Sequence, residues 1–227
     1  MSGPAAVEVR ALRFRWPRAA ADTLVIDSLD IGAGEAVFLH GPSGCGKSTL
    51  LGLLAGVLVA ADGHVSVLGQ DWAALRGARR DAMRADHVGY IFQQFNLLPW
   101  LSVLDNVRLP CRFSAARARR AGAGAAEKLL DRVGLPAALW PRPAAELSVG
   151  QQQRVAAARA LVGAPELVIA DEPTSALDAA LRDDFMALLM DAVRESAATL
   201  VFVSHDERLA ARFDRRLSLP ELNRAAR

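Results

Sequence analysis

Gly41-Pro-Ser-Gly-Cys-Gly-Lys47-Ser48-Thr49 is the stretch that decides the fold, because it fits the pattern G-x-x-x-x-G-K-[ST]. An apolar segment at residues 36–39, expected to be a buried strand, precedes it, and a helix is predicted over residues 47–55. The glycines let backbone N–H groups face inward, and the N-terminus of the following helix adds partial positive charge. The stretch therefore predicts a loop that holds the phosphates of a nucleotide.

Lysine is rare in this chain, since only Lys47 and Lys128 are lysine among the 27 Lys and Arg residues. A compact ammonium at position 47 suits a point-charge contact with terminal phosphates better than the broad arginine fork does. Ser48 offers a hydroxyl to Mg²⁺. Thr49 is either an ordinary first-turn helix residue or a contact to the α-phosphate. Cys45 is a small loop residue that would make the site sensitive to thiol reagents.

The composition is that of a folding chain and argues against several classes of function. With 227 residues, 52% hydrophobic and 23% charged, it suits one domain with a small inserted subdomain. A net charge of +2 argues against nucleic-acid binding through phosphate contacts. Two cysteines, Cys45 and Cys111, are too few for a disulfide framework or a structural zinc site and indicate a reducing cytoplasm.

No run reaches the roughly 18–20 apolar residues of a membrane span. Residues 1–10 lack a secretion-signal pattern, so we expect another polypeptide to supply any membrane-spanning part.

Short strands and helices alternate along most of the chain. We predict strands at residues 7–13, 24–31, 36–39, 64–68, 167–170 and 200–203, and helices at residues 47–55, 150–162 and 181–196. This order predicts an α/β fold, a mostly parallel sheet with helices on both faces. Residues 94–147 have few strand signals, and residues 114–134 read as helical with a break at Gly122 and Gly124. We interpret this part as a helical insertion in the sheet domain.

An acidic pair, Asp171 and Glu172, follows the predicted strand 167–170. The carboxyl ends of strands are where α/β sheets bind ligands. Asp171 is therefore a candidate to hold Mg²⁺ through water, and Glu172 is a candidate to accept a proton from an attacking water. The alternative is a solvated acidic turn, which the phosphate-binding loop elsewhere in the chain makes less attractive.

Leu147-Ser-Val-Gly-Gln151, followed by Gln152-Gln153-Arg154, resembles the signature motif LSGGQ-QQR of the ABC ATPase family. From the residues alone, the S-x-x-Q spacing predicts a capping box at a helix start. A capped N-terminus with a serine hydroxyl is also an anion site. The resemblance implies that Ser148, Gly150 and Gln151 hold the γ-phosphate bound to an opposite subunit. Val149 stands where the strict motif has glycine, and we expect its side chain to point away.

Three further family motifs occupy their expected places. Gln93, within Tyr90-Ile-Phe-Gln-Gln94, resembles the Q-loop glutamine, which contacts Mg²⁺ or the attacking water; the alternative is a polar residue that ends a strand. Ser175-Ala-Leu-Asp178 resembles the D-loop that crosses the dimer interface, although Asp178 would equally serve as a helix N-cap. Val203-Ser-His205-Asp206 resembles the switch motif, in which His205 contacts the γ-phosphate and positions the water.

An aromatic residue near the N-terminus completes the expected site. Trp16 stands where the family has an aromatic residue stacked on adenine, and tryptophan stacks as well as tyrosine. Phe14 is the competing candidate, and a core role stays open for either residue.

The resemblance extends from about residue 7 to about residue 219 and implies a P-loop NTPase core with an antiparallel β-subdomain and a helical insertion. We expect a single ABC ATPase domain over residues 1–227, with core and β-subdomain at about 1–93 and 148–227 and the helical subdomain at about 94–147.

The resemblance also implies ATP hydrolysis, with ATP and Mg²⁺ bound at a defined set of residues. The expected catalytic residues are Glu172, His205 and Gln93, and the expected metal contacts are Ser48, Gln93 and Asp171. The expected nucleotide contacts are Trp16, Gly41, Pro42, Ser43, Gly44, Cys45, Gly46, Lys47, Ser48, Thr49, Ser148, Gly150, Gln151 and Asp178.

The implied partners are a second copy of the chain, closing head to tail on two ATP molecules, and integral membrane permease subunits, with no nucleic acid. The expected location is the cytoplasmic face of the inner or plasma membrane, as a peripheral subunit.

The stretches at residues 88–99 and 101–110 look like the lipoprotein-release and macrolide-efflux branch, so we expect export, lipoprotein release or mechanotransmission. An importer subunit is the alternative, little weakened by the end of the chain soon after residue 219. A soluble ABC protein acting on DNA or ribosomes is the remote alternative, because the sequence shows no tandem cassette, zinc or coiled-coil insert, or basic arm.

Overall fold

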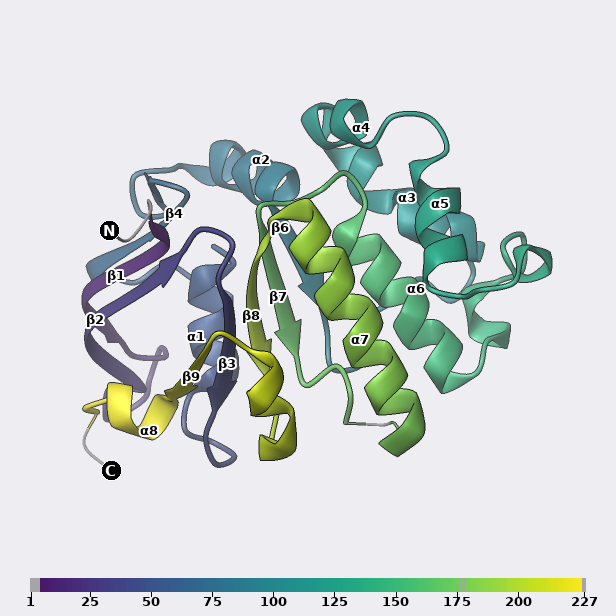
Figure 1. The fold of residues 1–227 in the computed structure, drawn as a ribbon. Helices are drawn as coiled ribbons and strands as arrows, with labels where there is room; N and C mark the ends of the chain where they lie inside the picture. The colour runs from purple at the N-terminus through teal and green to yellow at the C-terminus, as the bar shows by residue number, and fades with distance from the viewer. Residues whose placement is uncertain (1–4, 176, 178, 226–227) are drawn as a thin grey trace. The chain divides into compact units, whose positions relative to one another are not determined.

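The computed structural model describes residues 5–175, 177 and 179–225 (Figure 1). Two compact units make up the chain. The first runs as far as Arg84 and resumes at Thr199, and the second comprises Ala85–Ala198. Each unit contains parallel strands, three in the first unit and two in the second. The boundary between the two units lies within the helix α2 (Gly77–His87).

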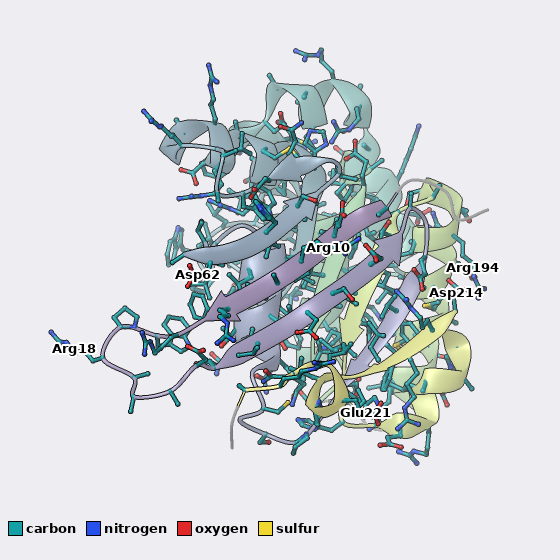
Figure 2. The ribbon with its side chains drawn as sticks, turned by 90° about the vertical axis from the view of Figure 1, so that its left-hand side faces the viewer. Arg10, Arg18, Asp62, Arg194, Asp214 and Glu221 are labelled. Atoms are coloured by element: carbon teal, nitrogen blue, oxygen red, sulfur yellow. The ribbon has the colours of Figure 1, made fainter. Side chains whose placement is uncertain are left out.

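The antiparallel sheet of the first unit has the strand order β2-β1-β4-β5. Its strands are β1 (Ala5–Phe14), β2 (Leu24–Gly32), β4 (Asp62–Val67) and β5 (Gln70–Asp71). Val7 and Val9 of β1 are fully buried, whereas the alternate residue Arg10 pairs with Asp30 at 2.7 Å on the other face, because successive strand residues point to opposite sides. Figure 2 shows Arg10 on this sheet and Arg18 in the loop that joins β1 to β2.

Three parallel strands complete the first unit. β3 (Ala36–His40) pairs on one side with β8 (Thr199–Val203) and on the other with β9 (Arg215–Ser218). β3 and β8 are nearly continuous apolar runs, as strands buried on both faces are. Leu39 lies opposite Val203, so the segments that follow β3 and β8 leave the same edge of the sheet. The helices of this part are α1 (Lys47–Leu54), the 3-10 segment η3 (Glu207–Arg212) and α8 (Leu219–Leu222).

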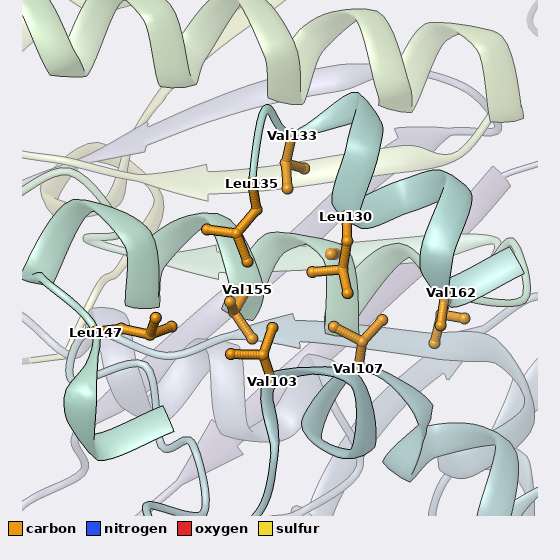
Figure 3. Close-up of a cluster of buried hydrophobic side chains, with 10 residues drawn as sticks. Val103, Val107, Leu130, Val133, Leu135, Leu147, Val155 and Val162 are labelled. Atoms are coloured by element: carbon orange, nitrogen blue, oxygen red, sulfur yellow. The ribbon is translucent and has the colours of Figure 1, made fainter. Parts of the chain in front are cut away.

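The second unit pairs β6 (Val88–Ile91) with β7 (Leu167–Asp171) in parallel, with Ile91 opposite Ala170. Its helices are α3 (Val103–Phe113), α4 (Ala115–Ala121), α5 (Ala125–Arg132), α6 (Val149–Leu161) and α7 (Ala179–Ser196), with 3-10 segments η1 (Ala137–Leu139) and η2 (Ala144–Glu146). Figure 3 shows the apolar cluster that joins α3, α5 and α6, in which Val103, Val107, Leu130 and Val155 are fully buried. This cluster holds α6, and therefore the residues at its N-terminus, in a fixed place within the unit.

The predicted α/β fold with parallel and antiparallel strands is confirmed, and each predicted strand and helix is present within a few residues. The predicted break is also present, because Gly122 ends α4 with φ 69° and Gly124 precedes α5 with φ 74°. The sequence does not predict α2, α3, β5, β6, β9 or α8. The division into a core and a helical subdomain at residues 94–147 stays a prediction. Among the described residues, none of the helices combines the length and the apolar character that crossing a membrane requires.

Helix α3 was missed because Pro110 lies inside it. Proline removes a backbone donor and clashes with the preceding turn, which costs about 3 kcal/mol in a helix interior. Two features favour the helix despite this cost. Ser102 caps its N-terminus by accepting a hydrogen bond from the Asp105 N–H at 3.0 Å, and Val103 and Val107 bury their side chains in the cluster.

Candidate nucleotide site

The predicted phosphate-binding loop joins β3 to α1 in the first unit. Gly46 is the N-cap of α1 and has φ 105°, and a Cβ atom at this position would lie 2.8 Å from Cδ2 of Leu24. Only glycine fits both restrictions. Because glycine has no capping side chain, the N–H groups of the first turn of α1 stay available to an anionic ligand.

Lys47 folds back over this loop. Its ammonium donates to the Gly41 carbonyl at 2.8 Å and to the Pro42 carbonyl at 3.0 Å, and the residue is only 7% exposed. An ammonium has three N–H groups, so these two bonds leave one donor for a phosphate oxygen. The two carbonyls therefore hold a positive charge beside the N-terminus of α1, where the helix dipole also favours a negative ligand.

The first turn of α1 also contacts the aromatic residue proposed for adenine. Nε1 of Trp16 donates to Oγ1 of Thr49 at 3.3 Å, and Trp16 is 44% exposed. Phe14 is 9% exposed and meets Trp16 edge to face, with ring centroids 5.3 Å apart. Trp16 therefore presents open aromatic surface beside the loop, whereas Phe14 belongs to the core. Ser48 is exposed, as are the remaining tip residues Pro42, Ser43 and Gly44, while Cys45 is half-buried.

His205 follows β8, the strand that pairs with β3. It is exposed, and the preceding Ser204 is buried and accepts a hydrogen bond from the Asp206 N–H at 3.0 Å. The parallel register places the segment of His205 and the phosphate-binding loop at one edge of the sheet. The first unit thus brings together the loop, Trp16 and the switch segment.

The acidic pair and Gln93 lie in the second unit. Asp171 ends β7 and Gln93 follows β6, the strand paired with it, so both leave the same edge. Burial and the neighbouring carboxylate of Asp171, which accepts a hydrogen bond from the phenol, raise the pKa of Tyr90. Tyr90 therefore remains a donor at neutral pH and orients the Asp171 carboxylate. Gln93 is exposed beyond it.

Glu172 adopts an uncommon backbone conformation, with φ 46°. A residue other than glycine in this region costs on the order of 1–3 kcal/mol and clusters at functional sites. The turn that follows is closed by a hydrogen bond from the Ser175 N–H to the Glu172 carbonyl at 3.2 Å. A second bond, from Nε2 of Gln153 to the Pro173 carbonyl at 2.7 Å, holds it to α6.

The predicted capping box at the start of α6 is confirmed. The Gln151 N–H donates to Oγ of Ser148 at 3.4 Å, and the Ser148 N–H donates to Oε1 of Gln151 at 3.0 Å. Ser148 is exposed, Gly150 is half-buried, and Val149 is 49% exposed, so its side chain avoids the core. Asp178, the predicted D-loop residue, lies outside the described residues.

Arg159 of α6 also contacts this part of the second unit and was not predicted. It is 9% exposed and donates to the carbonyl of Asn96 at 2.6 Å and to that of Phe95, two residues with φ 48° and 59°. Burial lowers the pKa of Arg159 to about 10, so it stays charged at neutral pH. It therefore fixes the left-handed turn that follows Gln93.

Tyr90 and Gln153 were likewise missed, although faint signals exist for all three residues. Tyr90 is the only tyrosine of the chain. Gln153 and Arg159 are polar positions in a helix, α6, whose other buried residues are apolar, among them Val155 and Ala156. A polar residue in such a place needs a hydrogen-bonding partner.

Comparison with known proteins identifies the family. The family model described as ABC transporter matches residues 25–175. The lipoprotein-releasing system ATP-binding protein LolD of Anaeromyxobacter dehalogenans is 44% identical over 215 residues, which cover 94% of this chain and 90% of that protein. The macrolide export ATP-binding/permease protein MacB of Rhodopirellula baltica is 43% identical over 189 residues, covering 83% of this chain and 28% of that protein.

A solved structure is similar over nearly the whole chain. It is the dimeric post-hydrolysis state of the ATP-binding cassette MJ0796 bound to ADP and Pi, with a TM-score of 0.82 and 32% sequence identity over 97% of this chain and 98% of that one. The family resemblance drawn from the sequence motifs is thereby confirmed, and with it the P-loop NTPase fold. This chain belongs to the ABC transporter family and is one of its ATP-binding, ATP-hydrolysing cassettes.

Proposed function

We propose that this chain is the ATPase subunit of a membrane-associated complex for export, lipoprotein release or mechanotransmission, and that two copies close head to tail on two Mg-ATP. The observation that carries the proposal is that one chain has two different helix N-termini whose surroundings suit an anion. They are the N-terminus of α1, at the Lys47 loop of the first unit, and the capped helix N-terminus at Ser148 in the second. The dimeric state of the neighbour MJ0796 and the similarity to LolD and MacB support the dimer and the branch.

In this proposal each half-site has its own task. Lys47 and the N–H groups of α1 stabilise the β- and γ-phosphates, and Trp16 stacks on the adenine. Ser148, Gly150 and Gln151 of the second copy contact the γ-phosphate. Glu172 accepts the proton of the attacking water, while His205 contacts the γ-phosphate and positions that water.

The residues proposed for Mg²⁺ fit its chemistry. Ser48, Gln93 and Asp171 supply a hydroxyl, an amide carbonyl and a carboxylate, which are the oxygen ligands that Mg²⁺ prefers. The Asp171 carboxylate is already oriented by Tyr90. When bound, Mg²⁺ would supply positive charge against the phosphate oxygens.

A permease surface is proposed beside Gln93. Phe92 is 38% exposed and Trp100 is 72% exposed, and both belong to the segment between β6 and α3. Exposed aromatic residues that lie close together in the chain favour a protein partner. We propose that this segment contacts the cytoplasmic part of the permease.

The experiment is capture of the tagged chain from native membranes in mild detergent, with Trp100→Ala beside Phe113→Ala. Phe113 is a matched control because it is also an exposed aromatic, at 78%, but ends α3. We expect a permease with few spans and a large extracytoplasmic domain to copurify with the wild type and the Phe113 variant, and Trp100→Ala to lose it. A many-span importer permease would contradict the branch. Absence from membranes, with only soluble partners bound, would contradict the transport function.

A further inference from the structure

Gln153 is a buried polar residue to which the mechanism above gives no task. It lies on α6 and is 1% exposed. Its Nε2 donates to the Pro173 carbonyl at 2.7 Å, whereas its Oε1 has no hydrogen-bond partner within the described part of the chain. Half of this amide is thus satisfied, and the satisfied half contacts the residue directly after Glu172.

A contribution to stability alone does not explain a glutamine at this position. One buried hydrogen bond contributes about 0.5–1.5 kcal/mol net, whereas an unpaired buried acceptor costs about 1–3 kcal/mol. An apolar side chain of the same length would fill the space without that cost. The reason for a glutamine at position 153 must therefore lie in the backbone group that its amide binds.

The amide holds a turn that is under strain. Glu172 has φ 46°, and a residue other than glycine keeps this conformation only where the surroundings determine it. Pro173 has no N–H, so its carbonyl, an acceptor, is its one hydrogen-bonding backbone group. That carbonyl is the group to which Gln153 donates, so this hydrogen bond joins the turn directly to the buried helix α6.

We propose that Gln153 is a positioning residue, which holds the Pro173 carbonyl and thereby fixes the left-handed turn that aims the Glu172 carboxylate at the attacking water. The inference rests on the proposed role of Glu172 as the general base. Because α6 begins at the Ser148 cap, one helix then carries both the contact to the γ-phosphate of the second copy and the support of the base.

The test is Gln153→Met, which keeps an unbranched side chain of similar size but removes the amide. We expect kcat for ATP hydrolysis to fall by about 10- to 100-fold, the range for a misplaced catalytic group. The KM for ATP should change by less than about 2-fold, because the Lys47 loop is not altered. The thermal midpoint should fall only slightly, because the cost of the unpaired Pro173 carbonyl is offset by removal of the unpaired Oε1. The matched control is Trp140→Phe, which removes a side-chain donor to a different backbone carbonyl of the second unit, that of Leu135 at 2.9 Å; its kcat should stay near that of the wild type.

A double variant separates positioning from a general structural effect. In a Glu172→Gln background, Gln153→Met should cause no further loss, because it acts through a base that is already absent. An equal loss in both backgrounds would overturn the proposal, as would an unchanged kcat or a lowered thermal midpoint with lost ATP binding. If the methionine variant does not fold, Gln153→Glu keeps the shape. Its activity relative to the wild type should rise as the pH falls, because only the protonated carboxyl donates to the Pro173 carbonyl; no such rise would also overturn the proposal.

These outcomes are distinct from failure of the proposed function. If the wild-type chain hydrolyses no ATP, the proposed function and this inference both fall. If the wild type and Gln153→Met hydrolyse ATP equally, only the positioning role falls.

Discussion

Replacing Lys47 by methionine isolates the charge at the centre of the phosphate-binding loop. Methionine keeps an unbranched apolar stem of similar length, so the packing of the stem is retained. The ammonium, which bonds to the Gly41 carbonyl at 2.8 Å and the Pro42 carbonyl at 3.0 Å, is removed. Both carbonyls lie in a loop with an exposed tip, so water replaces the lost donor, and the free energy of unfolding should change by less than about 1 kcal/mol.

The effect on ATP is larger, because the lost contact joins two charged groups. Hydrogen bonds to charged groups contribute about 1.5–3 kcal/mol. Since each 1.4 kcal/mol changes a dissociation constant tenfold, the Kd for Mg-ATP should rise by about 10- to 150-fold. Adenosine has no phosphate, so its weaker binding at Trp16 should change by less than about 2-fold.

Isothermal titration calorimetry with Mg-ATP and adenosine measures both constants, and a thermal melt establishes that the variant is folded. Lys47→Arg is the informative second variant, because it keeps the charge on a broader group and should lose part of the affinity. An unchanged Kd for Mg-ATP in a folded Lys47→Met protein would refute the reasoning. An equal loss for adenosine would show that the loop had collapsed and that the charge was not the cause.

Three further predictions follow from other contacts. The pKa of Tyr90 is raised above its unfolded value of about 10, so its contribution to stability is complete below that pH and is lost as the pH rises toward the folded-state pKa. Tyr90→Phe should therefore flatten the alkaline fall in the free energy of unfolding, measured by urea titration, and an identical pH profile would count against the Asp171 contact. N-ethylmaleimide should block ATP binding by reacting with Cys45, and ATP binding by the Cys45→Ser variant should not be affected. Cys111 should react more slowly, because burial raises the pKa of its thiol. Peptide mass spectrometry measures both labelling rates, and faster labelling of Cys111 would contradict this order. Arg159→Met should lower the free energy of unfolding by about 2–4 kcal/mol, because two backbone carbonyls lose their donor; Arg159→Lys should recover part of it, and a loss below about 0.5 kcal/mol would contradict the role.

Local sequence signals predicted those parts of the fold whose stabilisation is local. Apolar residue types indicate burial, so they predicted the strands at residues 36–39, 167–170 and 200–203. Glycine allows backbone conformations that other residues avoid, so it predicted the break at residues 122–124. Helix α2 was missed because it has no fully buried residue and therefore no apolar face to detect. Helix α3 was missed because packing in the cluster of Figure 3 overrides the proline inside it.

The candidate site divides in the same way. The phosphate-binding loop and the capping box are contiguous stretches, so their residue types and spacing predict them. The choice between Trp16 and Phe14 depended on burial, which the sequence left open. Tyr90, Gln153 and Arg159 act through contacts with residues distant in the chain, which are Asp171, Pro173 and Asn96 respectively. The periodicity of a sequence does not predict such long-range pairs.

The central claim, that the ATP site is completed by a second copy, is tested most directly by the mass of the Glu172→Gln protein in solution. Loss of the general base should reduce hydrolysis by about 10²- to 10⁴-fold while ATP still binds. Size-exclusion chromatography with light scattering should then show a species of twice the 24.2 kDa chain in Mg-ATP and the single chain in ADP. Adding Ser148→Arg, which places a bulky group at the capped N-terminus of α6, should abolish the dimer and leave ATP bound to Lys47. A Glu172→Gln protein that binds ATP but stays at 24.2 kDa, or dimerises equally without nucleotide, would contradict the account.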